Sequence, residues 1–430
     1  MSARAPADAL AAIVGREHVV AGPSGAAVDG VEPRWRVSPG SVDEVSRILK
    51  LAASEHLSVA PRGSGSAVDL GMPPAPIDIA MDLCRLDGIL EYVPADMVAT
   101  VQAGVRLDVL GRELGKHGQM LALDPYGGLS RTVGGVLASG ASGPRRFRYG
   151  SGRDLLLGVR FVQADGTVTW GGSRVVKSVT GYDVPKLLVG SLGTLGVIVE
   201  ATLRLHPVPT ATGSWLFAFG SGEAAGSFVA AVLASTLEPE RLVWLNGAAL
   251  ARAGHPGETA IAVSIGSVVE AVATQGAALA ALASSSGGRA SVLADGFWAS
   301  LGSVLAGRIV LKLSSELGRL AFWAGELEQA CARRSLVPSM VGEAGNGVLR
   351  AAVEANAPPA DLAREIVSPL RERLAAEGGS LVVERAPVEL KRAVDVWGSV
   401  PEPALAVMKR LKTEFDPRGT LNPGRFVGGL

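Results

Sequence analysis

The feature that most constrains this chain is a set of three glycine-dense segments in its first half. The first, Pro61-Arg-Gly-Ser-Gly-Ser66, directly follows an apolar stretch that is typical of a β-strand. Gly63 and Gly65 carry no Cβ, so the backbone can turn through positive φ and press its N–H groups against an anion. Successive amides in such a turn form a concave nest for a pyrophosphate, and Ser64 and Ser66 add hydroxyl donors. A single turn of this kind is an ordinary tight turn as often as it is a phosphate-binding turn, so the interpretation depends on the other two segments.

The second and third segments are Thr132–Gly143 and Gly190–Gly196. The three segments together do not fit the dinucleotide-binding fold, which requires a Gly-x-Gly-x-x-Gly fingerprint. In the first segment, Gly63 and Gly65 are not followed by the third glycine of that fingerprint. A Thr132 hydroxyl at a helix N-terminus would meet a phosphate with the help of the helix dipole. Any one glycine here could simply allow a close helix–strand contact. Taken together, the three segments predict a seat for a cofactor that carries phosphate.

These segments, with matches at Lys177–Ile198 and at the C-terminal Phe415–Phe426, resemble the FAD-binding module of the vanillyl-alcohol oxidase and p-cresol methylhydroxylase superfamily. The resemblance reaches nearly from end to end of the chain. It implies an α+β fold, with a two-part FAD-binding domain of the p-cresol methylhydroxylase type and an antiparallel-sheet cap domain. The residues that we predict to contact FAD are Pro61, Arg62, Gly63, Ser64, Gly65, Ser66, Pro125, Thr132, Gly134, Gly135, Ser139, Gly140, Gly143, Val197, Ile198 and Asn422.

The segment His206-Pro-Val-Pro209 predicts a domain boundary, because proline cannot continue a central β-ladder. We therefore expect an FAD-binding domain over residues 1–209, a cap over 210–402, and a tail over 403–430 that returns to the FAD-binding domain. Within the cap, two successive α+β units predict one antiparallel sheet backed by helices. In the first domain, Ser41-Val-Asp-Glu44 predicts a capping box, and the Asp165-Gly166 turn predicts a hairpin.

Composition narrows the class of protein further. Lys plus Arg and Asp plus Glu both count 41, so no polyanionic partner such as nucleic acid is expected. The two cysteines, Cys84 and Cys331, cannot form a disulfide framework, a zinc site or an iron–sulfur cluster, and they suit a cytoplasmic protein. The N-terminus shows no signal peptide, and the alanine-rich runs are too interrupted for a membrane span. Peripheral membrane association through partners stays open.

Missing residue types bear on the chemistry. Arg62–Ala67 contains no histidine or cysteine, so FAD is expected to be bound without a covalent link. The five histidines show no ligand-pair spacing, so no metal is expected. Relatives that oxidise D-2-hydroxy acids carry a histidine-rich metal motif in the cap, which the corresponding Gly342–Arg350 lacks.

That departure, the short cap and the ending Arg425–Leu430 resemble the E subunits of bacterial glycolate oxidases. The resemblance implies a D-type flavoprotein subunit and an iron–sulfur subunit as partners. It further implies oxidation of glycolate or a related 2-hydroxy acid to the 2-oxo acid, with electrons passed through the flavin to the iron–sulfur partner. Two alternatives remain open: a non-catalytic subunit that holds FAD and relays electrons, and a stand-alone D-2-hydroxy-acid dehydrogenase or oxidase.

Oxidation of a 2-hydroxy acid needs a cation for the carboxylate and a base for the hydroxyl proton. Arg145 follows the second glycine segment and could reach a small anion, although a solvated basic face is an equal alternative. Tyr182, next to a glycine, could position substrate or a proton near the flavin. Lys177 and Arg350 complete the set of catalytic candidates.

Overall fold

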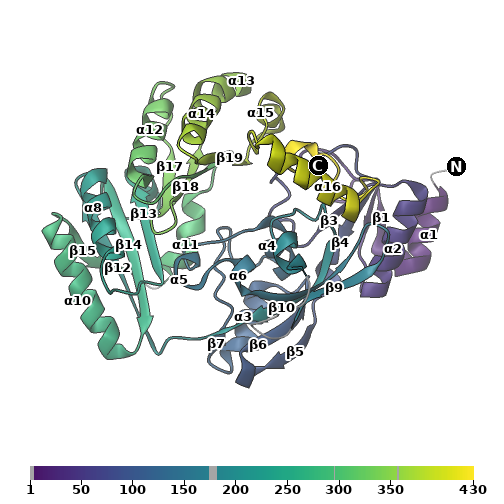
Figure 1. The fold of residues 1–430 in the computed structure, drawn as a ribbon, viewed down its shortest axis with the longest axis horizontal. Helices are drawn as coiled ribbons and strands as arrows, with labels where there is room; N and C mark the ends of the chain where they lie inside the picture. Colours follow the sequence, from purple (N-terminus) through teal and green to yellow (C-terminus); the bar gives the residue numbers. More distant parts are fainter. Residues whose placement is uncertain (1–3, 174–181, 295, 356–357) are drawn as a thin grey trace.

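Four β-sheets organise the part of the chain that the computed structural model describes, residues 4–173, 182–294, 296–355 and 358–430. The three smaller sheets lie in a lobe built from the N-terminal half and the C-terminal tail. The fourth sheet, with eight strands, forms the other lobe, and the two lobes lie side by side (Figure 1). This is the mixed α+β architecture that the sequence predicted.

The first sheet carries the first glycine segment at the end of one of its strands. Its central strands run parallel, and Ser41 caps its helix α2 (Val42–Glu55) by accepting a hydrogen bond from the Glu44 amide, as predicted. The Glu44 carboxylate accepts from the Gly40 amide at 2.7 Å instead of the Ser41 amide, so the predicted capping box is half formed. Val45, Ile48, Leu49 and Ala52 of α2 are buried. The strand order is β1 (Val19–Ala21), β2 (Trp35–Val37), β4 (Ile79–Asp82), β3 (Val59–Arg62), and α1 (Arg4–Val14) packs beside α2.

The second sheet has five strands, all antiparallel, and contains the predicted hairpin at Gly166. Its order is β5 (Ile89–Val93), β6 (Val98–Gln102), β10 (Val197–Arg204), β8 (Leu156–Val162), β9 (Val168–Gly172). The helices of this part are α3 (Leu107–Gly115), α4 (Val133–Ser139), α5 (Arg146–Tyr149), α6 (Gly152–Leu155) and α7 (Val184–Leu188).

The chain crosses from one lobe to the other within a few residues. Strand β11 (His206–Pro207) still pairs with β7 (Gln119–Met120) of the first lobe, whereas β12 (Ala211–Phe219) already belongs to the eight-stranded sheet. The expected boundary at residue 209 falls within this crossing.

The eight-stranded sheet consists of two units that mirror each other about its centre. The strand order is β15-β12-β14-β13 followed by β17-β18-β16-β19, and β13 joins β17 where Trp244 lies opposite Gly342. Each unit is a β-α-β-β-α-β arrangement of the kind that the two α+β patterns predicted. The bounds are β13 (Arg241–Asn246), β14 (Thr259–Ser267), β15 (Arg289–Val292), β16 (Ile309–Ser314), β17 (Ser339–Glu343), β18 (Val348–Val353) and β19 (Ser380–Arg385).

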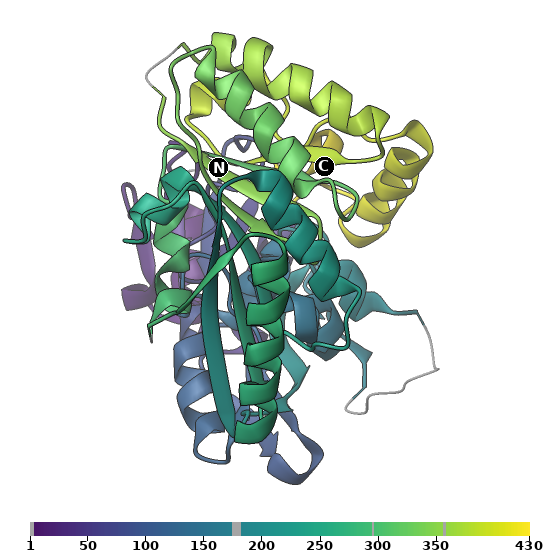
Figure 2. The ribbon, with the colours of Figure 1, turned by 90° about the vertical axis from the view of Figure 1, so that its left-hand side faces the viewer.

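Helices cover the two faces of this sheet unequally. Alternate strand residues such as Leu311 and Leu313 pack into one core with the helices of the outer face, and Figure 2 shows α10 running along β12 and β14 there. The intervening residues, Val310 among them, pack with α9 and α11 on the face toward the first lobe. The cap helices are α8 (Gly222–Leu233), α9 (Gly247–Arg252), α10 (Val269–Ser285), α11 (Phe297–Val304), α12 (Leu320–Ala332), α13 (Pro359–Leu362), the π-helical turn η4 (Ala363–Val367), α14 (Ser368–Ala376) and α15 (Val388–Ala393).

The C-terminal tail packs on the first lobe. Helix α16 (Glu402–Phe415) carries Lys412, whose Nζ donates to the Thr194 carbonyl at 2.8 Å and to Asp416 Oδ2 at 2.6 Å. Beyond it the backbone pairs with β3, since the Val59 amide donates to the Thr420 carbonyl at 2.7 Å. None of the described helices is both long enough and apolar enough to cross a bilayer.

Candidate cofactor and substrate site

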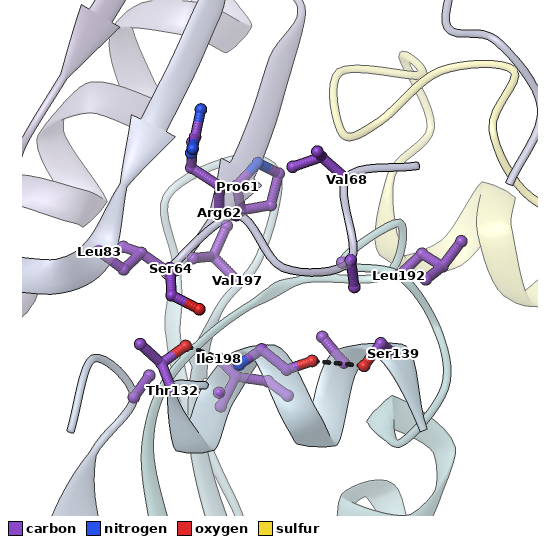
Figure 3. Close-up of a pocket in the computed structure, with 18 of the residues that line it drawn as sticks. Pro61, Arg62, Ser64, Val68, Leu83, Thr132, Ser139, Leu192, Val197 and Ile198 are labelled. Atoms are coloured by element: carbon purple, nitrogen blue, oxygen red, sulfur yellow. Dashed lines mark hydrogen bonds between the residues drawn. The ribbon is translucent and has the colours of Figure 1, made fainter. Parts of the chain in front are cut away.

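A first cavity of about 770 Å³, its solvent-open part included, lies in the first lobe where the glycine segments meet. Figure 3 shows the loop after β3 on one side and the start of α4 on the other, with Val197 and Ile198 of β10 behind. Thirteen of the residues that we predicted to contact FAD are among its lining, the last of them from the C-terminal tail: Pro61, Arg62, Gly63, Ser64, Gly65, Ser66, Thr132, Gly134, Gly135, Ser139, Val197, Ile198 and Asn422.

The two glycines of the first loop serve different needs. Gly65 has φ +78°, the left-handed conformation that the sequence predicted. Gly63 does not lie in that region, so the expectation of positive φ was wrong there. A Cβ at Gly63 would come within 2.0 Å of Thr132 Oγ1, so this glycine is required by a close approach between the loop and α4.

Helix α4 begins at the cavity. Thr132 precedes its first turn, and Thr132 Oγ1 accepts a hydrogen bond from the Gly135 amide at 3.3 Å. Ser139 Oγ donates to the Gly135 carbonyl at 2.7 Å, and both bonds are drawn in Figure 3. Gly134 lies against Ala103, the residue that follows β6, because a Cβ at Gly134 would sit 2.6 Å from the Ala103 Cβ. The Val133 and Gly134 amides donate to the Val105 and Ala103 carbonyls, so the helix start presents small side chains rather than free amide groups to the cavity.

Asn422 joins the tail to the cofactor loops. Its Nδ2 donates to the Leu192 carbonyl at 2.6 Å, and its backbone has φ +44°. Its Oδ1 is buried and has no hydrogen-bond partner within the described residues. A buried acceptor without a partner is costly, so this oxygen fits a hydrogen-bond donor on a bound ligand.

Three predicted cofactor residues lie elsewhere. Gly140 ends α4 with φ +64° and lines the second cavity described below. Gly143 and Pro125 line neither cavity. A Cβ at Gly143 would come 1.8 Å from the Asp124 carbonyl, so Gly143 allows a close contact between two backbone segments.

A second cavity, of about 1430 Å³ with its open part, lies between the first lobe and the cap. It shares Ser66, Ala67 and Ser139 with the first cavity, so the two are continuous. Its charged lining comprises four cationic and two anionic side chains: Arg131, Lys312, Arg350, Arg385, Asp69 and Glu384. This excess of positive charge favours an anionic ligand.

Arg350, a predicted catalytic residue, is part of this lining and is almost fully buried. Its Nη1 donates to Glu343 Oε1 at 2.7 Å and its Nε to Glu384 Oε2 at 3.0 Å. Its guanidinium also lies 4.9 Å from the ring centre of Tyr126. Although burial opposes it, these two carboxylates raise the pKa of Arg350, and burial raises the pKa of Glu343. Arg350 is a permanent cation with both sides of its guanidinium engaged.

Lys312 lies directly beside it. In the ladder between β16 and β18, Lys312 stands opposite Arg350. Within the described residues, its ammonium group has no hydrogen-bond or ion-pair partner. Burial, and then the neighbouring Arg350, lower the pKa of Lys312.

The other catalytic candidates lie away from the lining. The Arg145 amide donates to Asp124 Oδ1 at 2.9 Å, and burial lowers the pKa of the Arg145 side chain in the interface between the lobes. Tyr182 is 95% exposed and lines neither cavity. Lys177 lies outside the described residues. Of the four candidates, the structure brings Arg350 to the cavity.

Several lining residues were not predicted. In the first cavity these include Leu192, Gly193 and Arg425, and in the second Tyr126, Arg131, Lys312 and Glu384. Gly193, with φ +69°, belongs to the third glycine segment and could have been found there. The charged residues come from distant parts of the chain and carry no local signal.

The two cavities fit FAD. The first offers the glycine loop after β3, the small residues of α4 and the unpartnered Asn422 oxygen to a pyrophosphate and its nucleoside. The second offers room between the lobes for a ring and a substrate. As far as the described part of the chain shows, neither lining contains a histidine or a cysteine. Among the described residues, no three His, Cys, Asp or Glu side chains gather in a way that could hold a metal ion.

Comparisons with known proteins agree with this arrangement. Two family models match, described as "FAD binding domain" over residues 33–172 and "FAD linked oxidases, C-terminal domain" over residues 308–426. Glycolate oxidase subunit GlcD of Bacillus subtilis is 26% identical over 91% of this chain and 88% of its own length. A D-lactate dehydrogenase of Archaeoglobus fulgidus is 38% identical over 40% of this chain and 38% of its own. The crystal structure of p-cresol methylhydroxylase with substrate bound superimposes with a TM-score of 0.79 at 16% identity, covering 98% and 96% of the two chains.

The fold and the matched families define an FAD-binding protein, whose cavity at the junction of the three glycine segments fits the cofactor. The chain is an FAD-dependent oxidoreductase with the p-cresol methylhydroxylase fold, and it contains an FAD-binding domain and a C-terminal domain of the FAD-linked oxidase type.

Proposed function

We propose that the chain takes part in the oxidation of glycolate, or of a closely related small 2-hydroxy acid, to the 2-oxo acid. The observation that carries this proposal is the second cavity, which is continuous with the cofactor cavity and lined by an excess of cations. A carboxylate is held by such a lining, while the carbon to be oxidised faces the cofactor. The names of the glycolate oxidase and D-lactate dehydrogenase relatives support the same substrate class.

In this proposal the chain's residues divide by cavity. Ser64, Ser66 and the amides of the first loop hold the pyrophosphate of FAD, and Thr132 with the start of α4 supports it. Val197 and Ile198 provide an apolar wall. When bound, FAD supplies a two-electron acceptor for the hydride of the substrate.

Cap residues handle the substrate. A cation of the lining holds its carboxylate, and the lobe interface excludes water from the reacting carbon. Arg350 is kept in place by Glu343 and Glu384, so it gives the cavity a fixed positive charge beside the ring of Tyr126.

The proposal places the chain in a complex, as the E-type flavin subunit beside a D-type flavoprotein and an iron–sulfur subunit, in the cytoplasm and reaching a membrane only through partners. The matched relative is itself named as a subunit. Our reason is that the lining of the second cavity contains neither a histidine nor a cysteine, so this chain has no thiolate ligands there for a cluster that would carry electrons onward. We expect the docking surface to lie partly on the cap.

A second candidate is a non-catalytic subunit that holds FAD and relays electrons. The absence of a histidine from both described linings favours it, because histidine is the usual base for the hydroxyl proton. A stand-alone D-2-hydroxy-acid dehydrogenase is the third.

Anaerobic mixing with substrate separates these candidates. The purified FAD-loaded chain is mixed with glycolate or D-lactate, alone and then with the D-type and iron–sulfur proteins, while the flavin absorbance is followed. Bleaching that becomes fast only with the partners supports the subunit function. Full turnover by the isolated chain supports the stand-alone enzyme, and bleaching confined to the partner's flavin supports the relay.

A further inference from the structure

Lys312 differs from the other cations of the second cavity in having no hydrogen-bond or ion-pair partner among the residues that the structure describes. It projects from the middle of β16, flanked by Arg350 on β18 and Val382 on β19. Its side chain is half-buried and lines the cavity. Within the described residues, none of its three donor positions has an acceptor.

The neighbouring cations are already engaged. Arg350 is held between two carboxylates. The Nε of Arg385 lies 3.7 Å from Asp69 Oδ2, and the side chain is largely exposed. Arg131 Nη2 donates to the Ser66 carbonyl at 3.1 Å, so it braces the cofactor loop. An ammonium group without acceptors in a partly dry cavity is costly, and an incoming anion relieves that cost.

Charges from four elements face Lys312. They are Arg350 on β18, Glu384 on β19, Glu343 on β17 and Arg146 on α5. The two carboxylates accept hydrogen bonds from Arg350, whereas the two arginines repel the Lys312 ammonium group. The balance of burial and these charges lowers the pKa of Lys312, which leaves its charge the most easily removed of the cavity's cations.

We propose that Lys312 binds the carboxylate of the substrate. Arg350 is a positioning residue, because its ion pairs with Glu343 and Glu384 link β18 to β17 and β19 and keep a fixed positive charge beside Lys312. That the anion is a 2-hydroxy acid rests on the proposed function. That the cavity takes a small carboxylate through Lys312 rests on the contacts alone.

The proposal fixes the sign of a pH dependence. The anchor works when Lys312 is protonated, and a bound carboxylate raises its pKa again. Anion affinity is therefore constant well below the pKa of free Lys312 and falls as pH rises through it, by roughly tenfold per pH unit. Burial moves the start of this fall below the ordinary lysine range.

The test uses the FAD-loaded protein and oxalate, an anion of the size of glycolate that has no hydrogen to give up as hydride. Binding is followed by calorimetry and by the perturbation of flavin absorbance. Lys312→Met keeps the length and apolar volume of the side chain and removes the charge, Lys312→Arg restores a cation, and Arg385→Met removes another charge from the same cavity.

We expect Lys312→Met to weaken oxalate binding by roughly tenfold or more, since a charge-assisted hydrogen bond is lost. Lys312→Arg and Arg385→Met should stay within about threefold. The fall in affinity with rising pH should vanish in Lys312→Met. FAD content and melting temperature check that each variant is folded. Undiminished binding in Lys312→Met, or equal losses in Lys312→Met and Arg385→Met, would overturn the proposal.

The outcomes separate this inference from the proposed function. Oxalate binding that depends on Lys312, in a protein that does not bleach with glycolate even with its partners, keeps the anchor and rejects the reaction. If glycolate bleaches the flavin and Lys312→Met leaves the KM for glycolate unchanged, the proposed reaction stands and Lys312 is not the carboxylate anchor.

Discussion

The two cavities of this protein are continuous, yet they are built by opposite means. The cofactor cavity is made from main chain and small side chains, and a single Cβ at Gly63 would collide with Thr132. The cap cavity is made from long charged side chains that meet across strands, with Arg350 at their centre. Added atoms should therefore damage the first cavity, and removed charges should damage the second. The shape of the backbone therefore defines the cofactor cavity, and the balance of charges defines the cap cavity.

The largest effect on stability is expected from Arg350→Met, which leaves the buried Glu343 and the half-buried Glu384 without their counter-charge. The free energy of unfolding should fall by about 3–5 kcal/mol. Burial raises the pKa of Glu343, so without Arg350 the folded state should bind protons more readily than the unfolded state. The deficit should therefore shrink as pH is lowered from neutral toward 5. Urea denaturation at several pH values measures both effects.

A matched double variant sharpens this test. Arg350→Met with Glu343→Gln removes one of the two stranded charges and should recover part of the lost stability. If Arg350→Met alone costs less than about 1 kcal/mol, the cap cavity is not held by charge balance. The contrast between the two cavities would then be wrong.

The next effect concerns the cofactor cavity. Gly63→Val should weaken FAD binding by roughly 100-fold, because the added side chain enters the space of Thr132 Oγ1 and closes the approach to the loop. Gly65→Val should act in the same direction through its φ of +78°. FAD content after dialysis, read from the ratio of flavin to protein absorbance, measures the loss.

Gly111→Ala is the control for this pair. Gly111 is exposed within α3 of the same lobe, and a Cβ there would meet no atom within 4 Å. It should keep FAD fully and stabilise the helix by about 0.5–1 kcal/mol. A Gly63→Val protein with full FAD would show that the loop is not the seat of the pyrophosphate.

The same contrast explains what the sequence could predict. Some features depend only on neighbouring residues, so the residue types predict them: positive φ at Gly65, the Ser41 cap and the turn at Gly166. The glycine and serine residues of the cofactor lining were predicted for this reason, whereas Val197, Ile198 and Asn422 were predicted from the family resemblance. The mirrored units of the cap were also predictable, because each repeats the same order of strands and helices.

Other parts depend on tertiary packing. Strand β5 has a charged residue in the middle of a half-exposed pattern, so its sequence does not predict a strand. Helix α11 depends on its packing against α9, which the sequence does not reveal. Lys312 and Arg350 meet because β16 pairs with β18, a register that no local pattern specifies. Arg145 shows the converse, since its closeness in sequence to a glycine segment did not bring it into a cavity lining.

The smallest effect tests whether the start of α4 acts through its hydroxyl. Thr132→Val keeps the shape of the side chain and removes the oxygen that accepts from the Gly135 amide. The loss of a helix cap costs about 1 kcal/mol of stability. If the same hydroxyl also supports the pyrophosphate, FAD affinity should fall by roughly fivefold as well. Ser41→Ala removes the matching cap of α2, which contributes no residue to the cofactor cavity, and should reduce stability alone. Equal FAD affinity in the two variants would show that Thr132 holds the helix and does not contact the cofactor.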